Sequence, residues 1–365
     1  MSTVFVTGFP GFIGSELVGR LLARYPADVH MACLVQPAYR PLAEQRIREM
    51  EGLDAAYKGR IHVWPGDIRR PDLSLDGQYG SLAEDVVEIF HLAAVYDLGV
   101  PREVGMAVNL AGTRHMLDFA AQCPRLRRFH YVSTCYVSGN YPGEFQETDL
   151  VKGQQFNNYY EETKYLAEVA VQERMQAGLP VTIYRPSIVV GDSQTGATQK
   201  YDGIYFFLQW LLRQPQAAAF LTVIGDPTQY EVNFVPRDFV VEALDYLSGR
   251  QSTVGQVFHL SDPQPLLVNE IIDVMGQATQ RRLVRLKLPG RLVKGAMRHV
   301  PGVANFVGIE PSAMDYFTHP TRYRCPKTLA ALAGSGIACP PFASYAAKLV
   351  QFMQAHPDIS PQAMV

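Results

Sequence analysis

The sequence carries no excess of charge of either sign and no long hydrophobic run. Its 33 Lys and Arg against 35 Asp and Glu give a net charge of −2, which argues against a nucleic-acid-binding protein. No stretch contains about 18 consecutive apolar residues, so we expect no transmembrane helix. The first strand-like run begins at Thr3, so we also expect no signal peptide.

Cysteine is scarce, and its spacing suggests neither a disulfide framework nor a metal site. The five cysteines form no Cys-x-x-Cys pair, and no cluster of His, Cys and Asp has the spacing of a zinc site. We therefore expect reduced thiols in a cytoplasmic protein, without a metal. The composition is otherwise ordinary, with 47% hydrophobic residues, and the length allows a large domain with a smaller companion.

Strands alternate with helices over the first half of the chain. Hydrophobic patterning predicts strands at residues 3–8, 29–35, 60–66, 86–94, 127–134 and 180–191, and helices at 11–25, 104–122, around Tyr160 and at 233–249. This alternation predicts an α/β fold, here a Rossmann-like doubly wound parallel sheet with right-handed crossovers.

A glycine-rich loop, VTGFPGFIG, joins the first predicted strand to the first helix. Gly8, Gly11 and Gly14 lie three apart, and glycine lets the backbone approach a ligand closely. The helix N-terminus that follows presents free N–H groups to a pyrophosphate. The loop therefore predicts dinucleotide binding, although its spacing differs from the common G-x-G-x-x-G.

The alternation weakens beyond Gly191, where prolines, loops and aromatic residues increase. We therefore expect two interleaved domains. A dinucleotide-binding Rossmann domain comprises residues 1–191 plus 232–262, and a smaller substrate-binding cap comprises residues 192–231 plus 263–365.

Three tyrosines surround one lysine in FNNYYEETKYLAE, residues 156–168. In a helix, side chains four residues apart share a face. Tyr160 is four residues before Lys164, whereas Tyr159 is five before it and Tyr165 is its neighbour. The spacing therefore predicts that Tyr160 lies beside the lysine.

The two motifs together, T-G-x-x-G-F-I-G and a later Y-x-x-x-K, resemble the extended short-chain dehydrogenase/reductase family. P-G-D-I, H-L-A-A, N-L-A-G-T and V-S-T-C-Y-V-S-G match further motifs of that family. The resemblance implies that an NAD(P) cofactor is bound by Gly8, Phe9, Pro10, Gly11, Phe12, Ile13, Gly14, Asp67, Ile68, Leu92, Ala93, Ala94, Tyr160, Lys164, Pro186 and Ser187.

The family also implies catalytic roles. Tyr160 would exchange the proton and Thr134 would hold the substrate carbonyl, with Ser133 and Asn109 as further candidates. At about 4 Å and an effective dielectric of about 20, the Lys164 ammonium favours the phenolate by about 4 kcal/mol, so we expect a lowered pKa for Tyr160.

Several of these residues also have plain structural readings. Asp67 fits a turn as well as an adenine contact, and Asn109 fits backbone bridging as well as catalysis. We expect His91 and His130 to be hydrogen-bonded core histidines.

The cofactor preference rests on the end of the second strand. CLVQPAYR lacks the acid that holds a ribose 2′-hydroxyl, and Arg40 or Arg46 could meet a 2′-phosphate. The alternative is that both arginines are solvated. We expect NADPH in preference to NADH or a permanently bound NAD.

The stretch YRPSIVVGDSQTG, residues 184–196, resembles the fatty acyl and carrier-linked thioester reductase branch. This implies reduction of a carbonyl or acyl thioester of a hydrophobic substrate, free or on a separate acyl-carrier protein. A nucleotide-sugar epimerase or dehydratase and a non-catalytic NADP sensor are the alternatives. The aromatic run Tyr205, Phe206, Phe207 and Trp210 is either core or ligand wall.

Residues 281–298 hold seven Lys and Arg, and no acid occurs from Val274 to Ile309. The segment is either a solvated basic face or a dock for coenzyme A phosphates, an acidic carrier protein or an anionic lipid surface. Peripheral membrane contact and a homodimer are left open.

Overall fold

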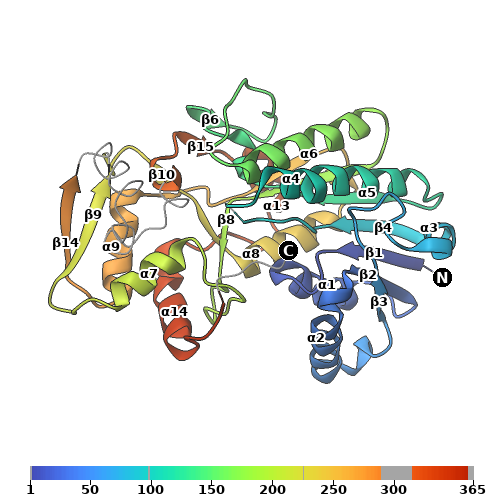
Figure 1. The fold of residues 1–365 in the computed structure, drawn as a ribbon, viewed down its shortest axis with the longest axis horizontal. Helices are drawn as coiled ribbons and strands as arrows, with labels where there is room; N and C mark the ends of the chain where they lie inside the picture. The colour runs from blue at the N-terminus through green and yellow to red at the C-terminus, as the bar shows by residue number, and fades with distance from the viewer. Residues whose placement is uncertain (1, 98, 225, 289–314, 361–365) are drawn as a thin grey trace.

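The computed structural model describes residues 2–97, 99–224, 226–288 and 315–360. A seven-stranded parallel sheet in the order β12-β7-β5-β4-β1-β2-β3 forms its centre, which confirms the predicted fold class (Figure 1). Its strands are β1 (Ser2–Thr7), β2 (Val29–Val35), β3 (Ile61–Pro65), β4 (Val86–His91), β5 (Arg128–Val132), β7 (Val181–Pro186) and β12 (Val257–Leu260).

Helices cover both faces of this sheet. One core contains side chains of α1 (Phe12–Arg24), α2 (Arg40–Leu53), α8 (Arg237–Ser248) and α13 (Pro326–Leu332). The opposite core contains side chains of α3 (Tyr79–Asp85), α5 (Gly112–Ala121) and α6 (Tyr159–Gln176). Val4 and Val6 point into the first core and Phe5 into the second, because successive strand side chains alternate between faces.

The predicted strand at residues 180–191 is two strands. After Pro186, β8 (Ile188–Val190) leaves the main sheet and pairs with β11 (Phe234–Pro236). Pro186 has no backbone N–H, which favours the end of a ladder at this point. The exchange of partners turns the chain toward the second part of the molecule.

The predicted helix at residues 104–122 is also irregular. A π-helical segment at Met106–Ala111 lies between α4 (Arg102–Gly105) and α5. Such segments are rare and often occur at functional sites. Asn109 lies within it.

A smaller assembly lies at one end of the sheet (Figure 1). Its core joins α7 (Ile204–Leu212), α9 (Val268–Ala278) and α14 (Phe342–Ala355). Two short ladders complete it, β9 (Ala219–Ile224) with β14 (Leu283–Leu288) and β10 (Glu231–Val232) with β13 (Leu266–Leu267). The predicted domain boundaries stay a prediction. Residues Thr321–Tyr323 form β15, which pairs with β6 (Gly143–Phe145) in a separate two-stranded ladder, and α13 packs on β12 of the large sheet.

The basic segment at residues 281–298 falls mostly outside the described residues. Within them, Arg281 donates to the backbone carbonyls of Leu212, Gln214 and Thr279, and Arg285 pairs with Asp273. The side chains of Arg281 and Arg285 therefore form contacts within the protein. The docking hypothesis for residues 289–298 concerns residues that the structure does not describe.

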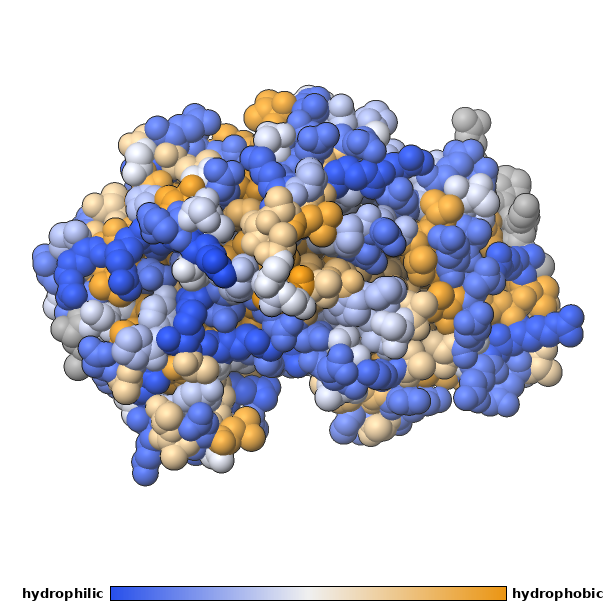
Figure 2. Space-filling model, turned by 180° about the vertical axis from the view of Figure 1, so that it is seen from behind, coloured by the Kyte–Doolittle hydropathy of each residue, from blue (hydrophilic) through white to orange (hydrophobic). Residues whose placement is uncertain are grey.

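The back face of the molecule intersperses hydrophobic with hydrophilic residues (Figure 2). Within residues 2–97, 99–224, 226–288 and 315–360, no helix has both the length and the apolar character needed to cross a membrane. The same ranges contain no group of three or more His, Cys, Asp or Glu arranged to hold a metal ion.

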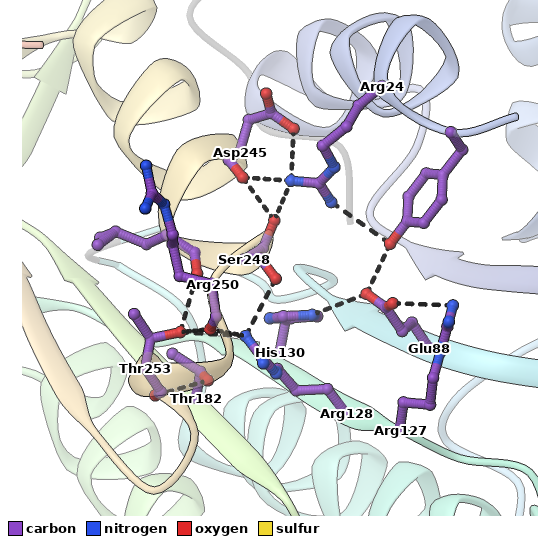
Figure 3. Close-up of polar contacts among 12 residues, drawn as sticks. Arg24, Glu88, Arg127, Arg128, His130, Thr182, Asp245, Ser248, Arg250 and Thr253 are labelled. Atoms are coloured by element: carbon purple, nitrogen blue, oxygen red, sulfur yellow. Dashed lines mark hydrogen bonds and ion pairs between the residues drawn. The ribbon is translucent and has the colours of Figure 1, made fainter. Parts of the chain in front are cut away.

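A buried polar network ties α1 and α8 to the sheet (Figure 3). Glu88 of β4 accepts hydrogen bonds from Tyr25 at 2.6 Å and from His130 at 3.2 Å. The other ring nitrogen of His130 bonds the Tyr184 hydroxyl at 3.0 Å. Arg24 pairs with Asp245 of α8 at 2.9 Å. His130 is therefore the hydrogen-bonded core histidine that the sequence led us to expect.

Three buried histidines predict acid-sensitive stability. Burial lowers the pKa of His130 to about 4 and that of His91 to about 3, and it lowers the pKa of His259 well below its usual value. The unfolded chain therefore takes up protons that the folded chain does not. We expect the free energy of unfolding to fall as pH drops below about 6.5, by up to about 1.4 kcal/mol per pH unit for each histidine.

Urea unfolding at about pH 7.5, 6.5 and 5.5 measures this slope above the range in which most carboxylates titrate. Between about pH 6.5 and 5.5, His130→Asn should reduce this slope, because it removes one of the groups whose pKa burial lowers. His356→Gln, a change at an exposed residue, is the control and should leave the slope unchanged. Equal stability at the three pH values would contradict the prediction.

Candidate active site

A cleft of about 890 Å³ opens at the carboxyl end of the sheet, where β1 and β4 are neighbours. This is the point at which the strand order reverses, and open parallel sheets bind ligands there. The residues with predicted cofactor roles that line the cleft are Gly8, Phe9, Pro10, Gly11, Phe12, Ile13, Gly14, Ile68, Leu92, Ala93, Ala94, Tyr160, Lys164, Pro186 and Ser187.

The glycine loop has no space for larger residues at two positions. Gly8 has a φ of +91°, and a Cβ on it would lie 2.8 Å from Leu92 Cβ. A Cβ on Gly14 would lie 2.4 Å from the carbonyl oxygen of Gly8. The loop can therefore lie directly against the end of β4. This contact places the N-terminus of α1 at the cleft.

The N-terminus of α1 is free to bind an anion. No side chain caps it at Gly11, and the first three residues of α1, Phe12, Ile13 and Gly14, all line the cleft. Backbone N–H groups at a helix N-terminus suit a pyrophosphate. The loop and helix thus fit a dinucleotide.

Asp67 is engaged within the protein. The Arg69 guanidinium bonds its carboxylate at 2.6 Å, and the Arg69 backbone N–H donates to it at 2.9 Å. Burial raises the pKa of Asp67, but the contacts with Arg69 outweigh this and lower it overall. Its neighbours Gly66 and Ile68 line the cleft, whereas Asp67 does not. The turn reading thus fits its contacts, and its adenine role stays a prediction.

The two candidate arginines for a 2′-phosphate are placed differently. Arg40 bonds Glu44 at 2.8 Å on the exposed side of α2 and does not line the cleft. Arg46 lines the cleft together with Gln36 and Tyr39. Arg46 is paired with Glu49 at 2.8 Å through one terminal nitrogen.

Tyr160 is the tyrosine that faces the cleft. Tyr159 is 48% exposed, and Tyr165 packs against the ring of Phe156 at 5.0 Å. Burial raises the pKa of Tyr160 to about 12, while a hydrogen bond with Thr134 works in the opposite direction. The expected lowering of this pKa by Lys164 is therefore not found.

Lys164 is buried and held on the neighbouring strand. Its Nζ donates to the Tyr131 hydroxyl at 3.0 Å and to the Val132 carbonyl at 2.9 Å. Burial lowers the pKa of Lys164 to about 7, against the opposing effect of Glu168. Burial therefore acts against the charged form of Lys164, as it acts against the charged form of Tyr160.

The two adjacent hydroxyls of Ser133 and Thr134 have different surroundings. Thr134 accepts from the Tyr136 backbone N–H at 3.2 Å and faces Tyr160. Ser133 donates to the buried carboxylate of Glu168 at 2.5 Å. Both line the cleft. Ser133 is held by the short bond to a buried carboxylate, whereas the Thr134 hydroxyl donates to the Pro186 carbonyl at a longer 3.4 Å.

Asn109 and His91 are bonded within the fold. The Asn109 amide bonds both the N–H and the carbonyl of Val95, at 2.9 and 3.0 Å, and donates to Thr163 at 3.0 Å. His91 bonds Thr7 at 2.7 Å and Thr113 at 3.0 Å. The bridging role of Asn109 fits these contacts, and its catalytic role stays a prediction.

The stretch GDSQTG fixes a loop rather than lining the cleft. Asp192 accepts from the backbone N–H groups of Gln194 and Thr195, at 3.0 and 2.8 Å, and Ser193 donates to Asp238 of α8 at 2.5 Å. Gly196 has a φ of +76° and lies against the carbonyl of Lys348 in α14. The loop is thereby anchored, and the residues that follow it, 198–206, reach the cleft.

Part of the cleft lining is a set of aromatic residues, here called the aromatic wall, that sequence patterning did not assemble. Its ring-bearing residues come from four separate segments and are Tyr96, Tyr136, Tyr205, Phe206, Tyr316 and Phe317. Tyr205 and Phe206 thus line the cleft. Tyr205 also belongs to the smaller core with Phe207, and Trp210 packs against that core. Both readings of the aromatic run therefore apply, and Tyr205 fits both.

One cation lies beside this wall. Lys200 Nζ is 4.4 Å from the ring centre of Tyr96 and 2.7 Å from Asp202. No local signal in the sequence pointed to Tyr96, Lys200 or Tyr131, because each acquires its partner from a distant segment.

Comparison with known proteins identifies the family. The family described as "Male sterility protein" matches residues 6–244. A linear gramicidin synthase protein of Brevibacillus parabrevis is 30% identical over 278 residues, which are 73% of this chain and 5% of that protein. Aldehyde reductase lnbA of Aspergillus flavus is 26% identical over 298 residues, which are 77% and 29% of the two chains. The chain thus covers only a minor part of either relative.

A solved structure agrees with these relatives. The terminal R domain from the myxalamid PKS-NRPS biosynthetic pathway matches with a TM-score of 0.80 and 27% identity, over 98% of this chain and 91% of that one. The chain therefore belongs to the extended short-chain dehydrogenase/reductase family of NAD(P)-dependent oxidoreductases, in its thioester reductase branch.

Proposed function

We propose that this protein is an NADPH-dependent reductase that acts on a carbonyl or acyl thioester with a hydrophobic acyl group. The observation that carries the proposal is that one cleft is lined both by the glycine loop and by the aromatic wall. Tyr160, Thr134 and Lys164 line this same cleft. Because the wall is mostly apolar, it suits an acyl chain better than a nucleotide sugar.

Tyr160 and Thr134 would have different roles in the reduction. A nicotinamide bound in the cleft would supply a hydride to the carbonyl carbon. Tyr160 would donate its proton to the carbonyl oxygen as the general acid. Thr134 holds the oxygen by donating a hydrogen bond.

A thioester leads to an aldehyde by the same steps. Protonation of the oxygen gives a hemithioacetal, whose carbon–sulfur bond then breaks to release a thiol and an aldehyde. A second round of reduction gives the alcohol. We infer that the thioester arrives on a carrier protein, and the match to a terminal R domain of a PKS-NRPS pathway supports this.

A substrate panel tests the proposal. NADPH oxidation is measured with octanoyl-CoA, an octanoyl-loaded carrier protein, octanal and UDP-glucuronic acid, with Tyr160→Phe as the inactive control. We expect turnover of the thioesters and octanal only. Conversion of the sugar nucleotide without net cofactor oxidation would instead support an epimerase.

Tyr160→Phe should lower kcat by about 10²–10⁴-fold, because the general acid is lost while the ring remains. NADPH affinity, followed by nucleotide fluorescence, should change little. Tyr159→Phe is the matched control one residue away on the exposed side of α6, and it should retain nearly full activity. The reverse pattern would show that Tyr159 is the acid.

Thr134→Ala should lower kcat by about 10²–10³-fold, because a hydrogen bond to the developing oxyanion is lost. Thr134→Ser restores the hydroxyl and should recover much of the rate. The comparison is of kcat with octanal, with the melting temperature as a check of folding. Full activity in Thr134→Ala would exclude this role.

Arg46→Ala should weaken NADPH binding by about 10–100-fold and leave NADH binding nearly unchanged, because a charge-assisted bond to the 2′-phosphate is lost. Arg40→Ala, which removes a cation from the same helix outside the cleft, is the control. Dissociation constants for both cofactors decide the outcome. Equal losses for NADPH and NADH, or a wild-type preference for NADH, would refute the assignment.

A further inference from the structure

We propose that Tyr131 is a positioning residue for Lys164 and the last member of a buried hydrogen-bond chain that begins at the cofactor loop. The inference rests on the proposed reductase function, since it concerns the same active site. Tyr131 lies on β5, 33 residues before the lysine. Lys164 Nζ contacts its hydroxyl at 3.0 Å and lies 4.5 Å from its ring centre.

The hydrogen-bond chain continues from Tyr131 across the sheet. The Tyr131 hydroxyl bonds Thr113 of α5. Thr113 Oγ1 lies 3.0 Å from His91 Nε2, and His91 Nδ1 lies 2.7 Å from Thr7 Oγ1. Thr7 Oγ1 also accepts from the Ala93 backbone N–H at 3.2 Å.

The hydrogen-bond chain starts beside the glycine loop. Thr7 directly precedes Gly8, and Ala93 and Gly8 both line the cleft. Each of the four side chains from Thr7 to Tyr131 is 1% exposed, so water cannot replace these bonds. A neutral His91 satisfies both of its links, because one ring nitrogen donates and the other accepts.

The Tyr131 hydroxyl favours the charged form of the lysine. The titratable groups that face Lys164 are Tyr160 and Glu168 from its own helix α6, His91 from β4 and Tyr131 from β5. Among the described residues, the Tyr131 hydroxyl and the Val132 carbonyl are the hydrogen-bond acceptors of Nζ. Because a buried ammonium depends on such acceptors, loss of the hydroxyl should lower the pKa of Lys164 further.

Tyr131→Phe tests this, because it removes the hydroxyl and keeps the ring. Tyr184→Phe is the matched control. Tyr184 lies on the neighbouring strand β7, is also fully buried, and bonds His130 instead of Lys164. The titration of Lys164 is followed by NMR of 13Cε-labelled lysine, and its resonance is assigned by its loss in Lys164→Met.

We expect Tyr131→Phe to lower the pKa of Lys164 by at least about one unit and Tyr184→Phe to leave it unchanged. With octanal and NADPH, kcat of Tyr131→Phe should fall roughly fivefold to tenfold near neutral pH and recover at lower pH, because the charged fraction of Lys164 falls with its pKa. The basic limb of the kcat profile should therefore shift toward acid in this variant alone.

Thr113→Val is a second variant that breaks the next link and keeps Tyr131, and it should shift the titration in the same direction by less. It decides the question if Tyr131→Phe does not fold. An unchanged Lys164 titration in the folded variants, or equal shifts in Tyr131→Phe and Tyr184→Phe, would overturn the proposal. If the wild-type protein reduced neither octanal nor a thioester, the reductase function would fail, while the titration would still decide the role of Tyr131.

Discussion

The active site depends on the close contact between the carboxyl ends of β1 and β4. Gly8 can lie against Leu92 and Ala93 only because it has no side chain and adopts a positive φ. This contact brings the N-terminus of α1 into the cleft. It also aligns Thr7 with His91 across the two strands, which is where the buried hydrogen-bond chain begins. The glycine loop and the hydrogen-bond chain to Lys164 thus meet at the same contact.

Buried charges fix the catalytic helix α6 on the sheet. Glu168 and Arg185 are both fully buried and bond at 2.6 Å, and Ser133 donates to the same carboxylate. Breaking such a pair leaves an uncompensated buried charge, which destabilises strongly. One turn earlier, Lys164 is held by Tyr131 and Val132. These contacts fix how closely α6 packs against the sheet. They therefore also fix the position of Tyr160 in the cleft.

Burial controls the pKa of Tyr160. It raises the pKa of the phenol to about 12, so the phenol keeps its proton at neutral pH. The sequence had suggested the opposite shift, since an ammonium four residues away should favour the phenolate. That argument left out desolvation, which raises the pKa of the buried phenol and lowers the pKa of the buried Lys164 to about 7.

Local sequence determined much of this protein. Hydrophobic alternation predicted the parallel sheet, three glycines predicted a close turn between β1 and α1, and the spacing of Tyr160 and Lys164 gave two cleft residues. These features depend on residues close together in the chain, whose periodicity fixes their geometry. Tertiary structure alone decided that Arg46 rather than Arg40 lines the cleft, that Ser133 bonds Glu168, and that rings from four segments form one wall. It also placed Tyr131 on Lys164. Each of these features depends on a partner from a distant element and on the burial that results. Local spacing in the sequence encodes neither the partner nor the burial.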